Sequence, residues 1–126
     1  MNDTYAELAD LPVSALWGQQ DPRIAEHLTL IGDIDLSEPD YSFDLLRFWV
    51  RKSDGMVLYA TDSGCSCPMP FEDTTVGELK ETTLAGVERA ARSHAHPHSS
   101  YGAVPAVDIV QGARALMPAM REAGAR

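Results

Sequence analysis

A β-hairpin over residues 41–61 is the feature that most constrains the fold of this chain. Residues 41–52 (YSFDLLRFWVRK) are rich in aromatic and branched side chains, which favour strands. Ser53, Asp54 and Gly55 follow, and Asp-Gly is typical of tight hairpin turns. Residues 56–61 (MVLYAT) then return antiparallel. Apolar residues fall on both faces of the first strand, so we expect it to lie in the centre of a sheet.

The segments on either side of the hairpin extend this prediction to an α+β fold. Residues 27–35 (HLTLIGDID) alternate and predict a further strand, with Leu28, Leu30 and Gly32 on one face. Asp21 followed by Pro is typical of a helix start. We expect one domain over residues 1–126, with a small antiparallel sheet of about three strands packed against C-terminal helices. Its parts are short helices (1–27), antiparallel strands (28–61), a cysteine loop (62–73) and a helical region (74–122).

Two local signals refine the prediction for the helical region. Thr75 and Glu78 match a capping box, which predicts a short helix over residues 76–81. The last helix should be kinked or restarted at Pro118, because proline lacks an amide proton and clashes with the preceding turn. The residues after that helix, 121–126, are expected to be frayed.

The charge of the chain argues against several classes of partner. Nineteen acidic and ten basic residues give a net charge of −9. Binding to nucleic acid or to an anionic membrane needs a basic surface, so neither is expected. No apolar run approaches the roughly 18 residues of a membrane helix, and the N-terminus does not resemble a signal peptide. We therefore expect a cytoplasmic protein with reduced thiols and a protein partner that offers a basic face.

Residues 61–73 (TDSGCSCPMPFED) form the most distinctive local sequence. Thr, Asp, Ser and Gly at its start favour a turn closed by side-chain hydrogen bonds to the backbone. Two prolines stiffen the second half of the loop, and the aromatic residue is expected to anchor it in the core. The same loop is a candidate binding surface, formed by Asp62, Ser63, Gly64, Pro68, Pro70, Phe71, Glu72 and Asp73.

Five residues are candidate metal ligands. Cys65 and Cys67 offer thiolates, and His94, His96 and His98 would point the same way in an extended segment. Two cysteines with two histidines satisfy tetrahedral zinc, although one residue separates these cysteines where zinc sites usually have roughly two to four. Two other interpretations stay open. The thiols can react, as a strained redox pair or a nucleophile, or they can pack as small buried side chains.

The run from residue 41 to residue 73 resembles a known family. Its YSFD start, its Asp-Gly hairpin and above all the motif D-S-G-C-S-C-P-x-P-F-E-D at residues 62–73 are similar to an uncharacterised family of small proteins. Members come from actinobacteriophages and their actinobacterial hosts. They share a strand, this motif and a helical tail, and no function is assigned to them. The resemblance implies a phage or prophage context, with the protein in the host cytoplasm, and it implies no reaction.

Two functions from different classes are compatible with these features. Nothing in the sequence matches a phosphate loop, a dinucleotide fingerprint, a nucleophile elbow or a metalloprotease helix. The leading hypothesis is a non-catalytic interaction module without a cofactor, which binds a host or phage protein. Its surface would be the 61–73 loop or the acidic turn over residues 33–44. The alternative is a zinc-binding or thiol-dependent site at Cys65 and Cys67. One form of this alternative is an enzyme that uses that site.

Overall fold

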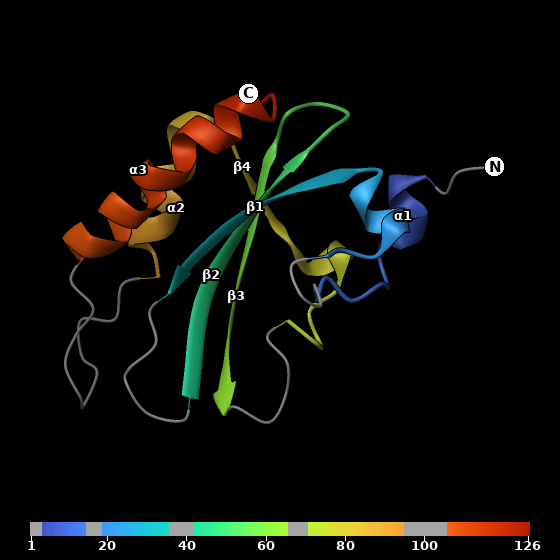
Figure 1. Ribbon diagram of the computed structural model, residues 1–126, viewed down its shortest axis with the longest axis horizontal. Helices are drawn as coiled ribbons and strands as arrows, with labels where there is room; N and C mark the ends of the chain where they lie inside the picture. The colour runs from blue at the N-terminus through green and yellow to red at the C-terminus, as the bar shows by residue number, and fades with distance from the viewer. Residues whose placement is uncertain (1–3, 15–18, 36–41, 66–70, 95–105) are drawn as a thin grey trace.

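The computed structural model describes residues 4–14, 19–35, 42–65, 71–94 and 106–126. Within these residues the centre is a four-stranded sheet in which the strands lie in chain order and all neighbours are antiparallel (Figure 1). The strands are β1 (Leu28–Asp35), β2 (Ser42–Arg51), β3 (Val57–Cys65) and β4 (Lys80–Thr82). The predicted α+β class is confirmed, with one strand more than expected.

The hairpin of β2 and β3 forms as predicted. The two strands pair without a break in register along their length. In the turn, Gly55 has a φ of 76°, a conformation that glycine adopts without steric cost. The Asp54 carboxylate accepts a hydrogen bond from the Met56 amide at 3.1 Å, which closes the turn. β2 also pairs with β1, so it lies inside the sheet as its two apolar faces predicted.

A bulge in β1 changes which residues face each side of the sheet. The register with β2 shifts between Leu30 and Gly32, so Ile31 is an extra residue. Leu30 lies opposite Trp49, whereas Gly32 lies opposite Phe48, whose side chain is on the other face. The prediction that Gly32 shares a face with Leu30 is therefore wrong. One inserted residue reverses the alternation that the sequence pattern suggests.

Two helices near the C-terminus cover one face of the sheet. They are α2 (Val87–Arg92), which follows the short 3-10 helix η3 (Leu84–Gly86), and α3 (Ala106–Glu122) (Figure 1). The predicted packing of a C-terminal helix against the sheet is confirmed. None of the helices that the structure describes is both long and apolar enough to cross a membrane. The buried core on this face contains Ile34, Leu46, Phe48, Val50, Val57, Val87, Ala91, Ile109, Ala113 and Met120.

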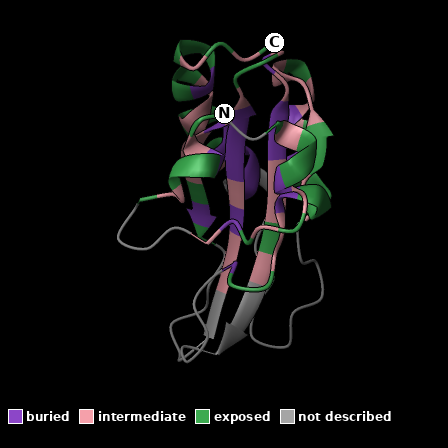
Figure 2. Cartoon of the chain, turned by 90° about the vertical axis from the view of Figure 1, so that its right-hand side faces the viewer, coloured by how far each residue is buried: buried purple, intermediate pink, exposed green. Residues whose placement is uncertain are grey.

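Shorter pieces cover the opposite face. They are the 3-10 helices η1 (Tyr5–Leu8) and η2 (Val76–Glu78) and the one-turn helix α1 (Pro22–Ala25). The start of α1 is as predicted, because the Asp21 carboxylate accepts a hydrogen bond from the Arg23 amide at 2.9 Å. Buried residues run along the middle of the strands, between the two covering layers (Figure 2). The core on this face contains Leu8, Val13, Ile24, Leu28, Trp49, Leu58, Phe71 and Val76.

The prediction of a helix over residues 76–81 is wrong beyond Glu78. The Thr75 hydroxyl contacts the Glu78 carboxylate at 3.1 Å, and it does not cap a helix amide. The chain then extends and pairs with β3 as β4. The Arg51 guanidinium binds the Glu81 carboxylate at 2.6 Å, so a partner far away in the sequence holds this segment in the sheet.

Three further expectations are corrected. β3 extends through Cys65, so residues 62–65 belong to a strand and not to a loop. α3 runs on through Pro118, so the predicted restart there is wrong, whereas the predicted kink stays a prediction. The end of the chain is not frayed, because the Arg126 amide donates to the Gly55 carbonyl and the Arg126 carbonyl accepts from the Leu84 amide, both at 2.7 Å. The last residues therefore join the hairpin turn to the start of η3.

Candidate functional site

The structure describes part of the predicted binding loop and places it at the end of β3. Asp62, Ser63, Gly64 and Cys65 are the last residues of that strand. Glu72 and Asp73 are exposed in the turn that precedes η2. Pro68 and Pro70 lie outside the described residues.

Phe71 is the anchor that the sequence predicted. Its side chain is fully buried and lies edge-on to the Trp49 ring, with centroids 6.0 Å apart. Its amide donates to the Asp62 carboxylate at 2.7 Å, which closes the loop across its base. The Arg47 guanidinium lies 4.5 Å from the centre of the Phe71 ring, and two of its nitrogens bind Asp33 (2.6 and 2.9 Å). Phe71 has a φ of 65°, which is costly outside glycine and is held here by these contacts.

The zinc hypothesis stays a prediction. Cys67, His96 and His98 lie outside the described residues. His94 follows α2, and its ring packs edge-on against Tyr59 with centroids 5.9 Å apart. Cys65 is the last residue of β3, four residues beyond Thr61, which lines the same pocket as His94. Among the described residues no group of three His, Cys, Asp or Glu side chains is placed to hold a metal ion.

The outer edge of β3 is only partly paired. β4 lies opposite the first three residues of β3, Val57–Tyr59. Beyond Tyr59, no strand among the described residues pairs with β3 on that side. The sheet thus ends in a step, with β4 short and β3 long.

The register shows which main-chain groups point toward this step. The Arg51 amide donates to the Met56 carbonyl at 2.8 Å, and hydrogen-bonded pairs in an antiparallel ladder alternate. The main-chain groups of Leu58 and Ala60 therefore point toward β2. Those of Tyr59, Thr61 and Ser63 point outward, and only Tyr59 has a β4 residue opposite it.

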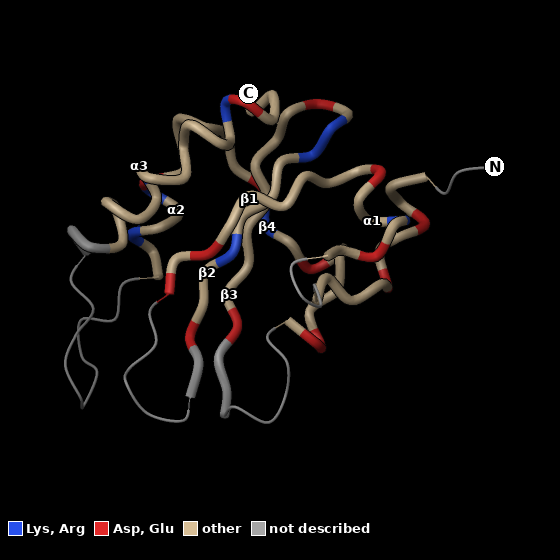
Figure 3. Tube along the Cα trace, viewed as in Figure 1, with Lys and Arg blue, Asp and Glu red and all other residues tan. Residues whose placement is uncertain are grey.

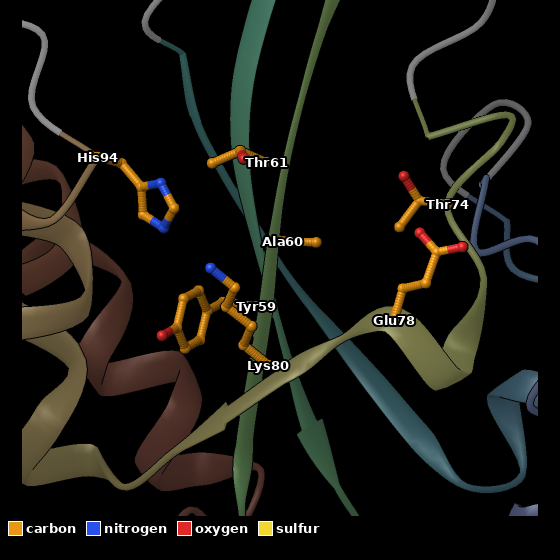
Figure 4. A pocket seen from close by; sticks show the side chains of 7 residues that line it. All are labelled: Tyr59, Ala60, Thr61, Thr74, Glu78, Lys80 and His94. Atoms are coloured by element: carbon orange, nitrogen blue, oxygen red, sulfur yellow. The ribbon is translucent and has the colours of Figure 1, made fainter.

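A small pocket lies at the step (Figure 4). It has a volume of about 130 Å³ and is lined by Tyr59, Ala60, Thr61, Thr74, Glu78, Lys80 and His94. Sites for small-molecule ligands and cofactors usually enclose roughly 300–1,000 Å³. The pocket is therefore too small for a typical cofactor and has the size for the ends of side chains or a few water molecules.

The pocket has two halves, which lie on opposite faces of β3. Lys80 is directly opposite Tyr59 in the ladder, so both side chains lie on the face that α2 and α3 cover. His94 contacts Tyr59 from the same side. Thr74 and Glu78 lie on the other side of the strand, as Figure 4 shows. This second half is held in place by the N-terminal segment, because the Val13 amide donates to the Thr74 carbonyl at 2.8 Å.

The charges in the two halves are of opposite sign. Among the residues that the structure describes, the Lys80 ammonium has no ion-pair or hydrogen-bond partner. Four arginines, at 23, 47, 51 and 114, are by contrast paired with carboxylates. Acidic positions are spread over the described chain, as Figure 3 shows, and Glu78 gives the second half of the pocket a negative charge.

Comparison with known protein families adds a classification. A family model described as a domain of unknown function, DUF7574, matches residues 18–119. The chain belongs to this family. The matched region of the DUF7574 domain contains all four strands and every residue that lines the pocket. No curated protein and no solved structure matches the chain.

Sequence reasoning missed most of this site. Within the DUF7574 domain it selected His94 as a metal ligand and Thr61 as the first residue of a loop, and both line the pocket. It did not select Tyr59, Thr74 or Lys80. The available signal was the short extended stretch after η2, but a three-residue strand is too short to show alternation.

Proposed function

We propose that this domain is a non-catalytic interaction module that binds an extended segment of another protein along the open edge of β3. The observation that carries the proposal is the step at Tyr59, where β4 ends and β3 continues. An unpaired strand edge presents a row of main-chain donors and acceptors, and an added peptide strand can satisfy them. In such complexes the main-chain bonds supply affinity, and small pockets for alternate side chains supply specificity.

The opposite edge of the sheet does not offer the same template. The bulge at Ile31 twists β1 and interrupts its regular ladder. The His27 carbonyl accepts from the Lys52 amide, so the next carbonyl, that of Leu28, points outward, and the Gln20 side chain donates to it at 3.0 Å. α3 also packs on β1, where Leu116 lies close to Gly32. The open edge of β3 is therefore the better place for an added strand.

Amide hydrogen exchange in the free protein tests whether this edge is open. We expect the amides of Leu58 and Ala60 to exchange slowly, because they lie in the ladder with β2, and those of Thr61 and Ser63 to exchange fast. Slow exchange at Thr61 and Ser63 in the free protein would show that the edge is already covered, and it would overturn the proposal.

A pair of variants at Thr61 tests binding. Peptides selected from a displayed library of linear ten-residue sequences serve as the probe. Thr61→Pro removes one outward donor and leaves the β2–β3 ladder intact, whereas Thr61→Val keeps the donor. We expect the selected peptides to bind the parent chain and Thr61→Val equally and Thr61→Pro at least tenfold more weakly. Equal binding to Thr61→Pro would rule out strand addition at this edge.

The motif at residues 62–73 supports a phage or prophage setting for this module. The partner is then a host or phage protein that meets the domain in the bacterial cytoplasm. Crosslinking in a cell that carries the corresponding phage genome tests this, with Thr61→Pro as the control. A partner crosslinked by the parent chain and lost in the variant supports the setting, and equal recovery of the same proteins by both contradicts it.

A further inference from the structure

The two oppositely charged halves of the pocket point to a sequence preference in the bound segment. This inference rests on the proposed strand addition and adds the chemistry of the partner. Neighbouring side chains in a strand point to opposite faces. A strand added beside Thr61 therefore directs one side chain toward Lys80 and the next toward Glu78.

The half on the helix-covered face suits an acid. The Lys80 ammonium has no ion-pair partner among the described residues, and the Tyr59 and His94 rings form the adjacent wall. A carboxylate placed here gains an ion pair and gives up no existing one. An apolar side chain would leave that ammonium unpaired.

The half on the other face suits a base. The Glu78 carboxylate has only the neutral Thr75 hydroxyl as its side-chain partner among the described residues, and Thr74 supplies a second hydroxyl to this wall. From a strand that lies beside Ala60, a lysine or arginine side chain can reach both the Glu78 carboxylate and the Thr74 hydroxyl.

We propose that the bound segment carries an acidic residue directly next to a basic one, with the acidic side chain toward Lys80 and the basic one toward Glu78. A second copy of this chain does not fit the role. Its own open edge has the sequence ATDSGC (residues 60–65), which contains an acid and no base. A net charge of −9 on each copy also opposes self-association.

A series of synthetic peptides tests the preference directly. The parent probe is Thr-Val-Glu-Lys-Val-Thr, and its relatives carry Glu-Glu or Lys-Lys at the centre. A fourth peptide, Thr-Glu-Val-Lys-Val-Thr, has the same composition but directs both charges to one face. Lys80 and Glu78 are exposed, so each ion pair is worth only about 1.5- to fivefold in affinity. We expect the Glu-Lys peptide to bind about two- to tenfold more tightly than the other three at low salt, with the difference reduced at high salt.

Single charge reversals in the domain should change the preference in opposite directions. Lys80→Glu makes both halves acidic and should favour the Lys-Lys peptide, whereas Glu78→Lys should favour Glu-Glu. Arg121→Glu is the matched control for the first change, because it alters the net charge equally at an exposed position on α3. The control should keep the preference for Glu-Lys.

The outcomes separate this inference from the proposed function. If all four peptides bind equally and Thr61→Pro abolishes binding, strand addition stands and the charge preference is wrong. If Thr61→Pro has no effect, both are wrong. A parent chain that sediments as a dimer, and a Thr61→Pro variant that sediments as a monomer, would make a second copy the occupant and overturn the inference.

Discussion

The two faces of the sheet are covered in different ways. On one face, α3 crosses the strands as a single long helix, and many medium-sized apolar side chains share the contact. On the other face, short helices and turns are joined by a few specific contacts around Trp49 and Phe71. The first layer follows from a repeated pattern, and the second depends on individual residues.

This difference affects how each face should respond to substitution. A layer built from many equivalent contacts loses part of its packing when one side chain is shortened. A layer that depends on one anchor loses the anchor and every contact that the anchor positions. The pocket lies at the junction of the two layers, so its halves should respond separately.

Removing the anchor of the irregular face should have the largest effect. We expect Phe71→Ala to lower the free energy of unfolding by about 3–5 kcal/mol, because a fully buried aromatic ring is lost and a cavity remains. Chemical denaturation measures the loss, and Phe71→Leu is the control that keeps most of the volume. Amides of residues 74–78 should also exchange faster in Phe71→Ala. A loss below about 1 kcal/mol would show that the loop is not anchored through this ring.

Shortening one side chain of the regular face should cost less. We expect Met120→Ala to lower the free energy of unfolding by about 2–3 kcal/mol, because α3 keeps its other buried contacts. The exchange of amides at residues 74–78 should follow only the global loss of stability. A selective increase there would contradict the separation of the two faces.

The hairpin turn connects the sheet with the end of the chain and gives a third prediction. A Cβ atom at Gly55 would lie 2.4 Å from the Gly124 carbonyl oxygen, and φ is 76°. We expect Gly55→Ala to destabilise the protein by about 1–3 kcal/mol through strain and displacement of residues 124–126. Gly124→Ala is the control, because a Cβ there meets no atom within 4 Å, although its φ of 89° still carries strain. Thermal unfolding of the two variants separates the destabilisation that the clash of the added Cβ causes from the destabilisation that the positive φ causes.

The regular parts of the fold could be predicted from local sequence. The Asp-Gly turn and the aromatic strand before it define the hairpin, and their signals lie within a few residues of each other. The irregular parts could not. β4 is held by Arg51, which binds Glu81 from another strand, and the bulge at Ile31 leaves no mark in the alternating pattern. Both depend on contacts between segments that are distant in the sequence.

The candidate site was predictable only in fragments for the same reason. Phe71 could be identified as an anchor because it is the one aromatic side chain in residues 61–73, and a large apolar side chain favours burial. The pocket arises only because β4 begins at Lys80, opposite Tyr59, and because His94, just after α2, lies beside Tyr59. No spacing rule links these three positions. A function based on the end of a strand therefore becomes visible only in the folded arrangement.

The smallest expected effect concerns the ion pair at the hairpin turn between β2 and β3. The Arg51 guanidinium binds the Asp54 carboxylate at 2.7 Å and lowers the pKa of that carboxyl below its usual value. The ion pair therefore stabilises the folded protein at pH values above the ordinary pKa of an aspartate. This stabilisation is lost as the pH falls through the lowered pKa of the folded state. We expect Asp54→Asn to cost under about 1 kcal/mol near pH 7, because the pair is partly exposed. Unfolding curves between pH 7 and pH 3 should show the difference between parent and variant shrinking below about pH 4. Glu122→Gln, at an exposed end of α3, is the control, and its difference in stability from the parent should not shrink at low pH. If the difference for Asp54→Asn stays constant with pH, its effect comes from the turn hydrogen bond with Met56 and not from the charge.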